Sequence, residues 1–310
     1  MTTEHDRRVA VAALRAAVPY LRLFQGKTFV VKAGGQVVAD RRRTRDLMEQ
    51  VGILHRLGIR VVVVHGGGAQ ATELASRLGL ETRFVEGRRV TDAATRDIAA
   101  MTLNGTVNTS IVAVCRGLQV PALGISGVDA GLVRARRRPP VEVEGEGEVD
   151  YGYVGDVVAV NAGALERILD ERFVPVVSPL SADENGELLN INADVVASRI
   201  AREMRAEKLI LITGAPGILE RRDDPSSLVS YTDVKGLEAL RAAGSLAGGM
   251  LPKVDAIESA LADGVARVHV VSYEVPDSLL LEVFTNEGCG TLVVLDTHSL
   301  RPEEIHPGSE

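Results

Sequence analysis

The stretch Ile59-Arg-Val-Val-Val-Val-His65-Gly66-Gly67-Gly68 is a run of β-branched residues that ends in three consecutive glycines. Four valines in a row leave no polar face, so we expect a strand buried on both sides, as in a parallel sheet. Residues 69–78 then have the composition and apolar spacing of a helix. Glycines between a strand and a helix let backbone N–H groups approach an anion beside the positive end of the helix. A tight turn without a ligand uses the same residues, so both interpretations stay open at this point.

A second copy of this pattern lies upstream. Lys27-Thr-Phe-Val-Val-Lys32-Ala33-Gly34-Gly35 again runs from a β-rich segment into glycines, now with Lys32 near the end of the strand. A buried ammonium needs a partner, and a nucleotide phosphate above Gly34 and Gly35 is one candidate. The alternative is a lysine that reaches solvent at the rim of the sheet. With an amphipathic helix over 47–57 between the strands, the order strand, helix, strand, helix predicts an α/β fold around a mainly parallel open sheet.

Length and composition exclude several classes of function. A chain of 310 residues with 45% hydrophobic residues can bury a large core. Its net charge of -7 argues against general nucleic-acid or anionic-membrane binding, and its 3% of aromatic residues argues against base stacking. We expect the basic clusters 41–43 and 134–138 to be solvated loop surface. Cys115 and Cys289 lack the spacing of a disulfide framework or zinc site, and no stretch reads as a membrane span or signal peptide, which predicts a cytoplasmic protein.

Two polar segments are candidates for binding a small molecule. Arg88 and Arg89 lie side by side in a loop, where a guanidinium fork could hold a carboxylate, although two solvated arginines would look the same. Asn190 and Asn192 stand two residues apart on an extended segment. They would therefore share a face, with paired side-chain donors directed into a cleft.

The second half of the chain supplies an acid and another lysine. Asp194 stands at the start of a helix over 195–204, where a capping role alone could explain it. A buried strand then ends in a glycine turn over 213–217, and the glycine-rich segment 244–253 ends in Lys253 at a helix start. The sequence has neither a Walker motif nor GxGxxG. Two lysines near glycine turns, one acid and loops rich in N–H groups suit phosphoryl transfer, in which catalysis is mainly positioning and charge neutralisation.

Six motifs closely resemble, in order and spacing, those of the acetylglutamate kinases of the amino acid kinase family. They are Lys32-Ala-Gly-Gly, His65-Gly-Gly-Gly, Gly87-Arg-Arg-Val-Thr, Asn190-Ile-Asn-Ala-Asp194, Leu211-Ile-Thr-Gly-Ala-Pro-Gly217 and Gly248-Gly-Met-Leu-Pro-Lys253. Any one of them is a weak signal, but six in register over residues 26–295 are a strong one. The resemblance implies a three-layer αβα sandwich, the amino acid kinase fold. It divides the chain into an N-terminal helical arm for oligomerisation at 1–26, an amino-acid-substrate lobe at 27–180, a nucleotide-binding lobe at 181–300 and a polar tail at 301–310.

The same resemblance implies the reaction and the roles of the site residues. The reaction is ATP-dependent phosphorylation of the γ-carboxylate of N-acetyl-L-glutamate to the acyl phosphate, the second step of arginine biosynthesis. Lys32 and Lys253 would neutralise the transferring phosphoryl group, and Asp194 would hold both lysines in place. The residues implied to bind the substrate are Gly67, Gly68, Arg89, Asn190 and Asn192. Those implied to bind the nucleotide are Gly34, Gly35, Thr213, Gly217, Ser245, Gly248 and Gly249. Mg²⁺ would be held mainly by ATP, with no metal site on the protein.

The expected chemistry needs no general base, because a γ-carboxylate with a pKa of about 4.3 is already ionised at pH 7. Two residues depart from the family pattern, namely Gly214 where an aspartate is usual and Ala33 where a larger residue is usual. They indicate altered nucleotide contacts or a related substrate, such as a carrier-bound amino acid or an aminoadipate of the lysine route. A non-catalytic, amino-acid-sensing module is the alternative of another class. Such a module should have lost Lys32, Asp194 or Lys253, and all three are present.

The first residues predict an assembly. Residues 9–24 read as a short helix that Pro19 should kink or interrupt, and a helix this short needs a surface to lie on. Its narrow apolar seam consists of Val11, Leu14, Val18 and Leu21. Residues 18–26 resemble the N-terminal helix of the arginine-inhibited, hexameric acetylglutamate kinases, which implies a homo-hexamer instead of a dimer. An arm that covers the edge of its own sheet is the alternative.

A last segment, 282–291, resembles the arginine-binding loop of the same class. The resemblance implies that Glu282 pairs with the guanidinium of an inhibiting arginine, and that Gly288 and Gly290 admit its α-carboxylate. The histidine that usually precedes this loop is replaced around Asp277, which predicts inhibition that is weak or lost.

Overall fold

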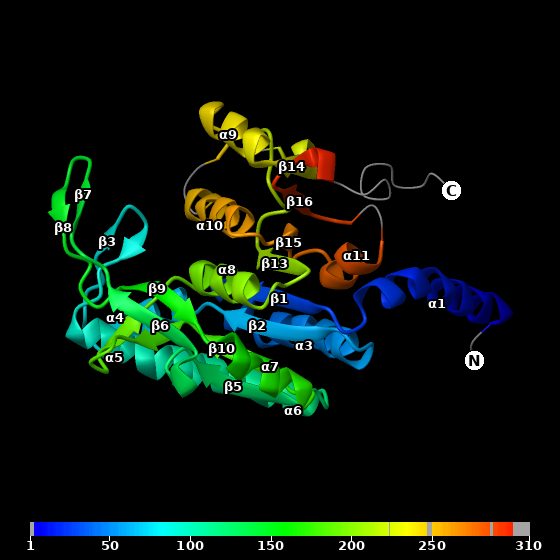
Figure 1. Cartoon of the computed structure of the whole chain (residues 1–310), viewed down its shortest axis with the longest axis horizontal. Coiled ribbons are helices and arrows are strands. Elements are labelled where there is room, and N and C mark those ends of the chain that lie inside the picture. The colour runs from blue at the N-terminus through cyan, green and yellow to red at the C-terminus, as the bar shows by residue number, and fades with distance from the viewer. Residues whose placement is uncertain (1–2, 223, 247–249, 286–287, 300–310) are drawn as a thin grey trace.

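The computed structural model describes residues 3–222, 224–246, 250–285 and 288–299, and a single large sheet runs through them (Figure 1). Its strands lie in the order β14-β16-β15-β13-β1-β2-β10-β5. In that order they span Tyr231–Asp233, Thr291–Val294, Val268–Ser272, Lys208–Thr213, Thr28–Ala33, Arg60–His65, Val174–Ser178 and Ala122–Ser126. Neighbouring strands are parallel except for β15 with β16, which confirms the predicted mainly parallel sheet.

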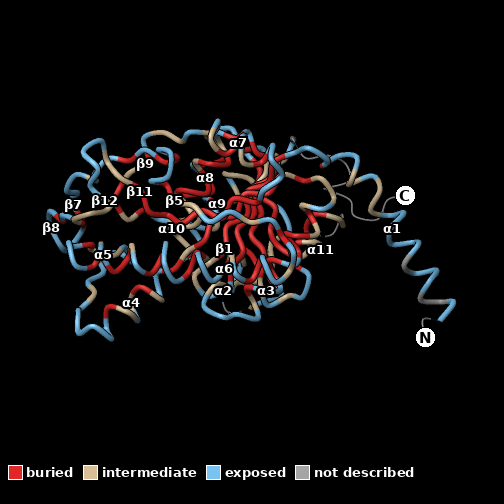
Figure 2. The backbone as a smooth tube through the Cα atoms, turned by 90° about the horizontal axis from the view of Figure 1, so that it is seen from below, coloured by how far each residue is buried: buried red, intermediate tan, exposed pale blue. Residues whose placement is uncertain are grey.

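Helices cover both faces of this sheet, which explains why its central strands carry no polar face. One core lies between the sheet and a first helical layer, which consists of α7 (Ala162–Asp170), α8 (Ala193–Glu203), α9 (Val234–Ala242) and α10 (Leu251–Ala262). The other core lies against a second layer, which consists of α2 (Gly35–Ala39), α3 (Arg41–Arg56), α6 (Thr109–Gly117) and α11 (Ser278–Phe284). Figure 2 shows the strands buried between these layers. The architecture is the expected three-layer αβα sandwich.

A smaller sheet and two hairpins belong to residues 84–190. The small sheet has the order β12-β11-β6-β9, with strands Leu188–Asn190, Leu180–Ala182, Val133–Arg137 and Gly155–Val160. The hairpins are β3 (Phe84–Val85) with β4 (Arg88–Arg89), and β7 (Val141–Val143) with β8 (Gly147–Val149). The expectation that 134–138 is loop surface is wrong, because Arg134 to Arg137 lie on β6, where polar and buried residues alternate.

The expectation for the basic cluster 41–43 also needs correction. The basic cluster 41–43 is the first turn of α3 instead of a loop, because the Asp40 side chain accepts the backbone N–H groups of Arg42 and Arg43 and starts the helix there. Residues 93–117 form one continuous helical run. It comprises α5 (Ala93–Ala100), the π-helical segment η1 (Met101–Asn108) and α6. Asp92 caps α5, because its side chain accepts the backbone N–H of Thr95.

The helical run over 93–117 also bears on the membrane expectation. By length and composition alone it is long and apolar enough to cross a membrane, which contradicts the expectation that no stretch is. Half of the most apolar 18-residue stretch of this run is buried inside the protein. Core helices of folded domains are often as long and as apolar. The helix is therefore weak evidence for a membrane.

The N-terminal helix α1 (Glu4–Phe24) projects from the body of the molecule (Figures 1 and 2). It continues through Pro19 without interruption, contrary to one of the two outcomes expected of that proline. Only its C-terminal end packs on the chain, where Phe24 stacks edge-on against Phe29. Val11 and Leu14 of the predicted seam are 53% and 64% exposed. Val18 and Leu21 are partly buried, so within the described residues the N-terminal half of the seam is the part left exposed.

The remaining elements are short or lie between the strands already described. They are α4 (Gly68–Arg77), η2 (Asp129–Gly131), η3 (Pro225–Ser227) and η5 (Thr297–Ser299). Strand β1 of the first predicted lobe pairs directly with β13 of the second. The boundary between the two lobes stays a prediction, and the predicted tail at 301–310 lies outside the described residues.

Candidate active site

Three charged side chains meet beside the carboxyl end of β1. Alternation along this strand directs Lys32 to the same face as Val30, where α8 packs. Lys32 Nζ lies 2.9 Å from Oδ1 of Asp194, the second residue of α8. Lys253 Nζ, from the first turn of α10, lies 3.5 Å from the same oxygen. The structure thus brings together the three residues that the sequence singled out for catalysis.

The capping alternative for Asp194 is resolved by its neighbour. Asn192 is the N-cap of α8, because its Oδ1 accepts the backbone N–H of Asp194 at 2.7 Å. The Asp194 carboxylate is therefore not needed as a cap and binds the two lysines. The Asn192 oxygen faces its own helix, so only its Nδ2 could serve as the predicted donor, and the donor face shared with Asn190 stays a prediction.

Burial and charge act against each other in this cluster. The three side chains are only 9% to 13% exposed. Burial alone would raise the pKa of Asp194, but the charges of Lys32 and Lys253 outweigh it and hold that pKa below its usual value. Burial, followed by repulsion from Lys32, lowers the pKa of Lys253. One carboxylate between two ammonium groups leaves a net positive charge, which suits an incoming phosphate.

The two glycine loops predicted from the sequence touch each other next to this cluster. Gly66 N–H donates to the Ala33 carbonyl at 2.9 Å, so the loop after β2 is tied to the end of β1. A Cβ on Gly35 would lie 3.6 Å from Gly67 N and 3.8 Å from Gly68 N. A Cβ on Gly67 would come within 2.6 Å of Leu103 Cδ2, so a side chain there would displace the end of this leucine. The N–H groups of Gly35, Gly67 and Gly68 therefore lie within one small region.

Gln70 joins these loops and was not singled out by the sequence. Its Nε2 donates to the Gly35 carbonyl at 3.0 Å across the two loops. Its Oε1 is buried and accepts no hydrogen bond within the described ranges. Gln70 follows the second glycine loop closely, but the Gly35 that it contacts lies 35 residues away in the sequence. No sequence motif could therefore have indicated this contact.

Arg89 reaches the start of α4 beside the second glycine loop. Its Nη2 donates to the Gly68 carbonyl and to Thr72 Oγ1, both at 2.7 Å, and its guanidinium lies over the Phe84 ring. Asn190, at the end of β12, has its Nδ2 3.5 Å from Thr91 Oγ1, two residues beyond Arg89. Arg89 therefore contacts the second glycine loop, and Asn190 lies beside the segment that carries Arg89.

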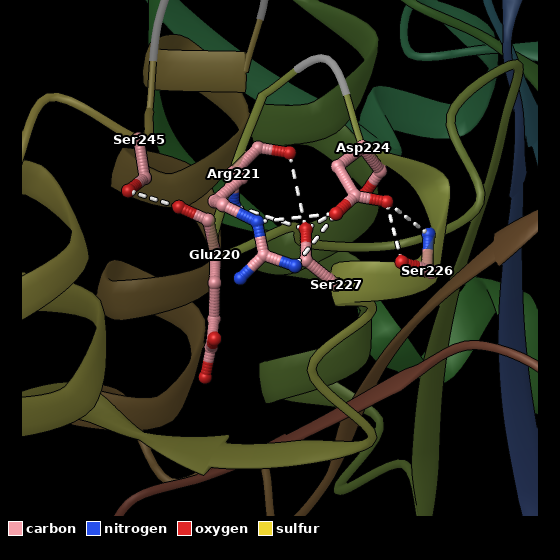
Figure 3. A network of polar contacts seen from close by, with 6 residues as sticks. All are labelled: Glu220, Arg221, Asp224, Ser226, Ser227 and Ser245. Carbon is pink, nitrogen blue, oxygen red and sulfur yellow. Dashed lines mark hydrogen bonds and ion pairs between the residues drawn. The ribbon is translucent and has the colours of Figure 1, made fainter.

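Three of the residues predicted to bind the nucleotide lie at or beside the segment that follows β13. Thr213 Oγ1 accepts the N–H of Ala215 and shapes the turn. Gly217 packs so closely on β16 that a Cβ would lie 2.5 Å from Thr291 Oγ1, which alone accounts for a glycine there. Ser245 donates to the Glu220 carbonyl at 2.6 Å (Figure 3). Gly248 and Gly249 lie outside the described residues.

Figure 3 also shows how the loop that receives Ser245 is held. Asp224 accepts from Ser226, and Arg221 forms an ion pair with it at 2.6 Å. Hydrogen bonds from Ser226, then from Arg221, lower the pKa of the exposed Asp224 to about 2. This loop therefore has its own local network next to the predicted nucleotide residues.

Gly214, which stands where the family usually has an aspartate, lies against a contact between Tyr273 and Gln36. Tyr273 Oη donates to Gln36 Oε1 at 2.7 Å, and a Cβ on Gly214 would lie 2.9 Å from Tyr273 Oη. The tyrosine and the glutamine thus fill the space that a side chain at position 214 would need. Gln36 directly follows the first glycine pair, so this contact connects that loop to the end of β15.

The predicted arginine-binding residues form a buried network. Glu282 Oε1 lies 2.6 Å from His269 Nδ1, and its Oε2 accepts the N–H groups of Cys289 and Gly290. Lys208 Nζ lies 2.9 Å from His269 Nε2. The sequence missed this histidine and looked for one near Asp277. A Cβ on Gly288 would lie 2.7 Å from Glu282 Oε2, so close packing accounts for the glycine at 288.

No metal cage is evident in the described part of the chain. No three histidine, cysteine, aspartate or glutamate side chains lie where they could hold a metal ion together, within the ranges given above. The carboxylate of Asp194 is engaged by two ammonium groups. The described residues therefore do not fit a protein-held Mg²⁺, which usually relies on carboxylates together with substrate phosphates.

Known proteins share both sequence and structure with this chain. The model of the "Amino acid kinase family" matches residues 27–272. An acetylglutamate kinase from Myxococcus xanthus is 46% identical over 91% of this chain and 94% of its own length. An acetylglutamate kinase from Archaeoglobus fulgidus is 43% identical over 91% of this chain and 98% of its own. These similarities extend over nearly the whole chain.

Solved structures agree with the sequence matches. The chain resembles N-acetylglutamate synthase from Neisseria gonorrhoeae complexed with coenzyme A and N-acetyl-glutamate, with a TM-score of 0.80 and 28% identity. The match covers 93% of this chain but only 64% of the synthase. Carbamate kinase from Giardia lamblia bound to AMP-PNP shares the fold at a TM-score of 0.62 and 17% identity. Fold, motif order and full-length similarity agree, and the chain belongs to the amino acid kinase family.

Proposed function

We propose that this chain transfers the γ-phosphoryl group of ATP to the γ-carboxylate of N-acetyl-L-glutamate, the second step of arginine biosynthesis. The observation that carries the proposal is the position of Lys32 and Lys253 on one oxygen of Asp194, beside two touching glycine loops. The substrate is supported by the relatives named acetylglutamate kinase, which match over nine tenths of the chain. The lobe that would bind each substrate follows the predicted division of the chain.

The geometry suits an ionised nucleophile. A carboxylate oxygen of the substrate bonds to the γ-phosphorus while the bond to the bridging oxygen of ATP breaks, and ADP leaves with that electron pair. The carboxylate is already deprotonated at pH 7, so no residue has to accept a proton. Lys32 and Lys253 offset the repulsion between the carboxylate and the phosphate. The lysine charges hold the pKa of Asp194 low, so its carboxylate stays ionised. Asp194 therefore positions the two lysines.

Mg²⁺ enters only as part of the nucleotide in this proposal. ATP phosphates bind it directly and the ion lowers their charge when it is bound. The described residues supply hydrogen-bond donors and lysines, and none of the steps assigned to them passes through the metal. The cytoplasm is the proposed compartment, which two free cysteines without a disulfide support.

A panel of substrates tests the acyl group and the chain length of the acid. We expect N-acetyl-L-glutamate with MgATP to give hydroxylamine-trappable acyl phosphate faster than acyl aminoadipates or other acylated acids do. A preference for an aminoadipate or for a carrier-bound acid would instead assign the chain to a related kinase. No acyl phosphate with any acceptor would favour the amino-acid-sensing module.

Replacement of a lysine tests the site itself. Lys253→Ala should lower kcat by two to three orders of magnitude, because the loss of one preorganised charge costs about 3 kcal/mol of transition-state stabilisation. Lys235→Ala, an exposed lysine on α9, is the matched control and should leave kcat unchanged. Circular dichroism would verify that the Lys253→Ala protein is folded. A folded variant with wild-type turnover would remove the kinase assignment.

We also propose that the arm α1 joins dimers into a hexamer and that arginine inhibits the enzyme near Glu282. The exposed seam of Val11 and Leu14 supports the first part. The second part is supported by the similarity to the Neisseria gonorrhoeae synthase, which has been solved with coenzyme A and L-arginine at a TM-score of 0.80. The Lys208 ammonium lies 5.3 Å from the centre of the Phe24 ring, so the network around Glu282 borders the end of the arm.

A further inference from the structure

His65 ends β2 on the face opposite the catalytic lysine. Alternation places Val64 with Lys32 and Val30 on one side, and His65 with Ala33 on the other side. The imidazole is completely buried. Its Nδ1 lies 2.8 Å from the carbonyl oxygen of Gly66, the first residue of the second glycine loop. The chemistry proposed above gives this buried titratable group no role.

Asn108 holds the other ring nitrogen. It is the last residue of the π-helical segment η1, and its Nδ2 lies 3.1 Å from His65 Nε2 and 2.9 Å from the Val176 carbonyl. A carbonyl only accepts hydrogen bonds, so the atom facing Val176 must be the amide nitrogen. The same nitrogen then donates its second hydrogen to His65 Nε2. The amide oxygen faces Gly124, where a Cβ would lie 2.1 Å away.

These contacts determine the protonation state of His65. Because Nε2 accepts from Asn108, the single proton of a neutral ring lies on Nδ1 and is donated to the Gly66 carbonyl. Burial lowers the pKa of His65 to about 4, an effect that the Gly66 carbonyl only partly offsets. The ring is therefore neutral throughout the physiological range of pH.

The Gly66 carbonyl and the Gly67 N–H belong to one peptide unit. In a planar trans peptide these two groups point in opposite directions. When His65 holds the carbonyl, the Gly67 N–H is therefore directed away from His65, and a Cβ on Gly35 would lie 3.6 Å from that nitrogen. Rotation of this peptide would cost no side-chain clash of its own, since glycines allow many conformations. Something outside the loop must therefore fix its orientation.

We propose that His65 and Asn108 are positioning residues, which orient the Gly66–Gly67 peptide so that the Gly67 N–H faces the transferring phosphoryl group. The π-helical segment is the element that makes this possible, because it brings Asn108 to His65 at the end of β2 and to the middle of β10 and β5 at once. Segments of this type are frequent at functional sites. The inference rests on the proposed phosphoryl transfer.

Two substitutions separate this role from simple filling of space. The amide nitrogen of an asparagine at 65 can occupy the position of Nδ1 and donate to Gly66, whereas a glutamine reaches the position of Nε2 and leaves the Gly66 carbonyl unheld. We expect His65→Gln to lower kcat by about 100-fold, with the dissociation constant of MgADP unchanged, since small misplacements of catalytic groups have effects of this size. His65→Asn should lose markedly less. His55→Gln, on α3, is the control for replacing a histidine.

The results decide between two failures. If the wild-type enzyme forms acyl phosphate but His65→Gln retains at least as much kcat as His65→Asn, the positioning role is wrong. If the wild-type enzyme forms no acyl phosphate with any acceptor, the proposed function is wrong. Nitrogen-15 NMR of the wild-type ring tests the geometry in either case and does not depend on folding of the variants. A neutral ring with the proton on Nδ1 at pH 7 is expected, and a proton on Nε2 or a charged ring overturns the inference.

Discussion

Asp194 holds two ammonium groups with one oxygen atom, and this shortage of negative charge defines the candidate site. Buried charges are costly unless they are paired, and breaking such a pair leaves an uncompensated charge. Here Lys32 takes the shorter contact and Lys253 the longer one. Lys253 is therefore the less well compensated cation, in accordance with its lowered pKa. A phosphate that enters between the lysines supplies the missing charge.

Also at the residue scale, the Tyr273–Gln36 contact can be tested through Gly214. A methyl group at 214 would push the Tyr273 hydroxyl away from Gln36, so Gly214→Ala should destabilise the fold by about 1 kcal/mol, the typical net value of one hydrogen bond. Tyr273→Phe removes the same bond and should cost about the same. The double variant should cost less than the sum, which denaturant unfolding of all three proteins measures. Full additivity would show that the two positions act independently.

Single residues differ in how far their sequence reveals them. Lys32, Asp194 and Lys253 stand in motifs, so the sequence could single them out, and the structure brings them together. Gln70, Asn108 and Tyr273 stand in no motif that points to their partners. Each contacts a glycine loop or its flanking residue from another element. Contacts of this kind depend on the fold in three dimensions, and neither spacing nor residue type encodes them.

At the scale of elements, Lys208, His269 and Glu282 tie β13, β15 and α11 together by one buried chain of hydrogen bonds. A lysine can only donate, so His269 Nε2 accepts from it and Nδ1 carries the proton that is given to Glu282. Two backbone N–H groups complete the carboxylate. The network thus places an ion pair, with a histidine between its charges, under the end of α1.

Acid should unfold the protein partly through this network. Burial alone would raise the pKa of Glu282, but the contacts with His269, the Cys289 N–H and Lys208 lower it from 4.5 to about 2. Its contribution, about 3 kcal/mol, is present above pH 4.5 and is lost as the pH falls toward 2. Glu282→Gln should therefore be less stable than the wild type at pH 6. The difference should shrink between pH 4.5 and the lowest pH at which denaturant unfolding can be followed, and a constant difference would contradict the assigned cause.

Elements also differ in what their sequence predicts. The buried strands β1, β2 and β13 follow from runs of β-branched and aliphatic residues, and their glycine ends follow from the same stretches. The π-helical segment η1 could not be predicted, because its residues fit an ordinary helix and only one extra residue per turn distinguishes it. Strand β6 was missed because alternating arginines on an exposed face look like a solvated loop.

At the scale of the whole molecule, α1 is the helix whose apolar residues pack least on the rest of the described chain. It is 21 residues long, and within the described part of the chain its seam residues Val11 and Leu14 remain 53% and 64% exposed, so most of its length lacks the tertiary packing from which helices in proteins gain most of their stability. The alternative in which the arm covers its own sheet edge does not match this geometry, since only the last turns contact the body. Phe24 and Tyr20 make those contacts, with Phe29 and Phe284 respectively.

The last prediction follows from that exposed seam. We expect sedimentation of the full-length protein to show a hexamer, and a chain that starts at Gly26 to show a dimer, because the arms would pair seam to seam between dimers. Leu14→Asp keeps the whole arm but places a charge in the seam, so it should also give the dimer. Arg15→Ala, which lies outside the seam, is its control. A dimer for the full-length protein would remove the arm's role. Arginine at millimolar concentration should raise the Michaelis constant of the hexamer, and equal rates with and without it would remove the regulatory proposal while leaving the assembly intact.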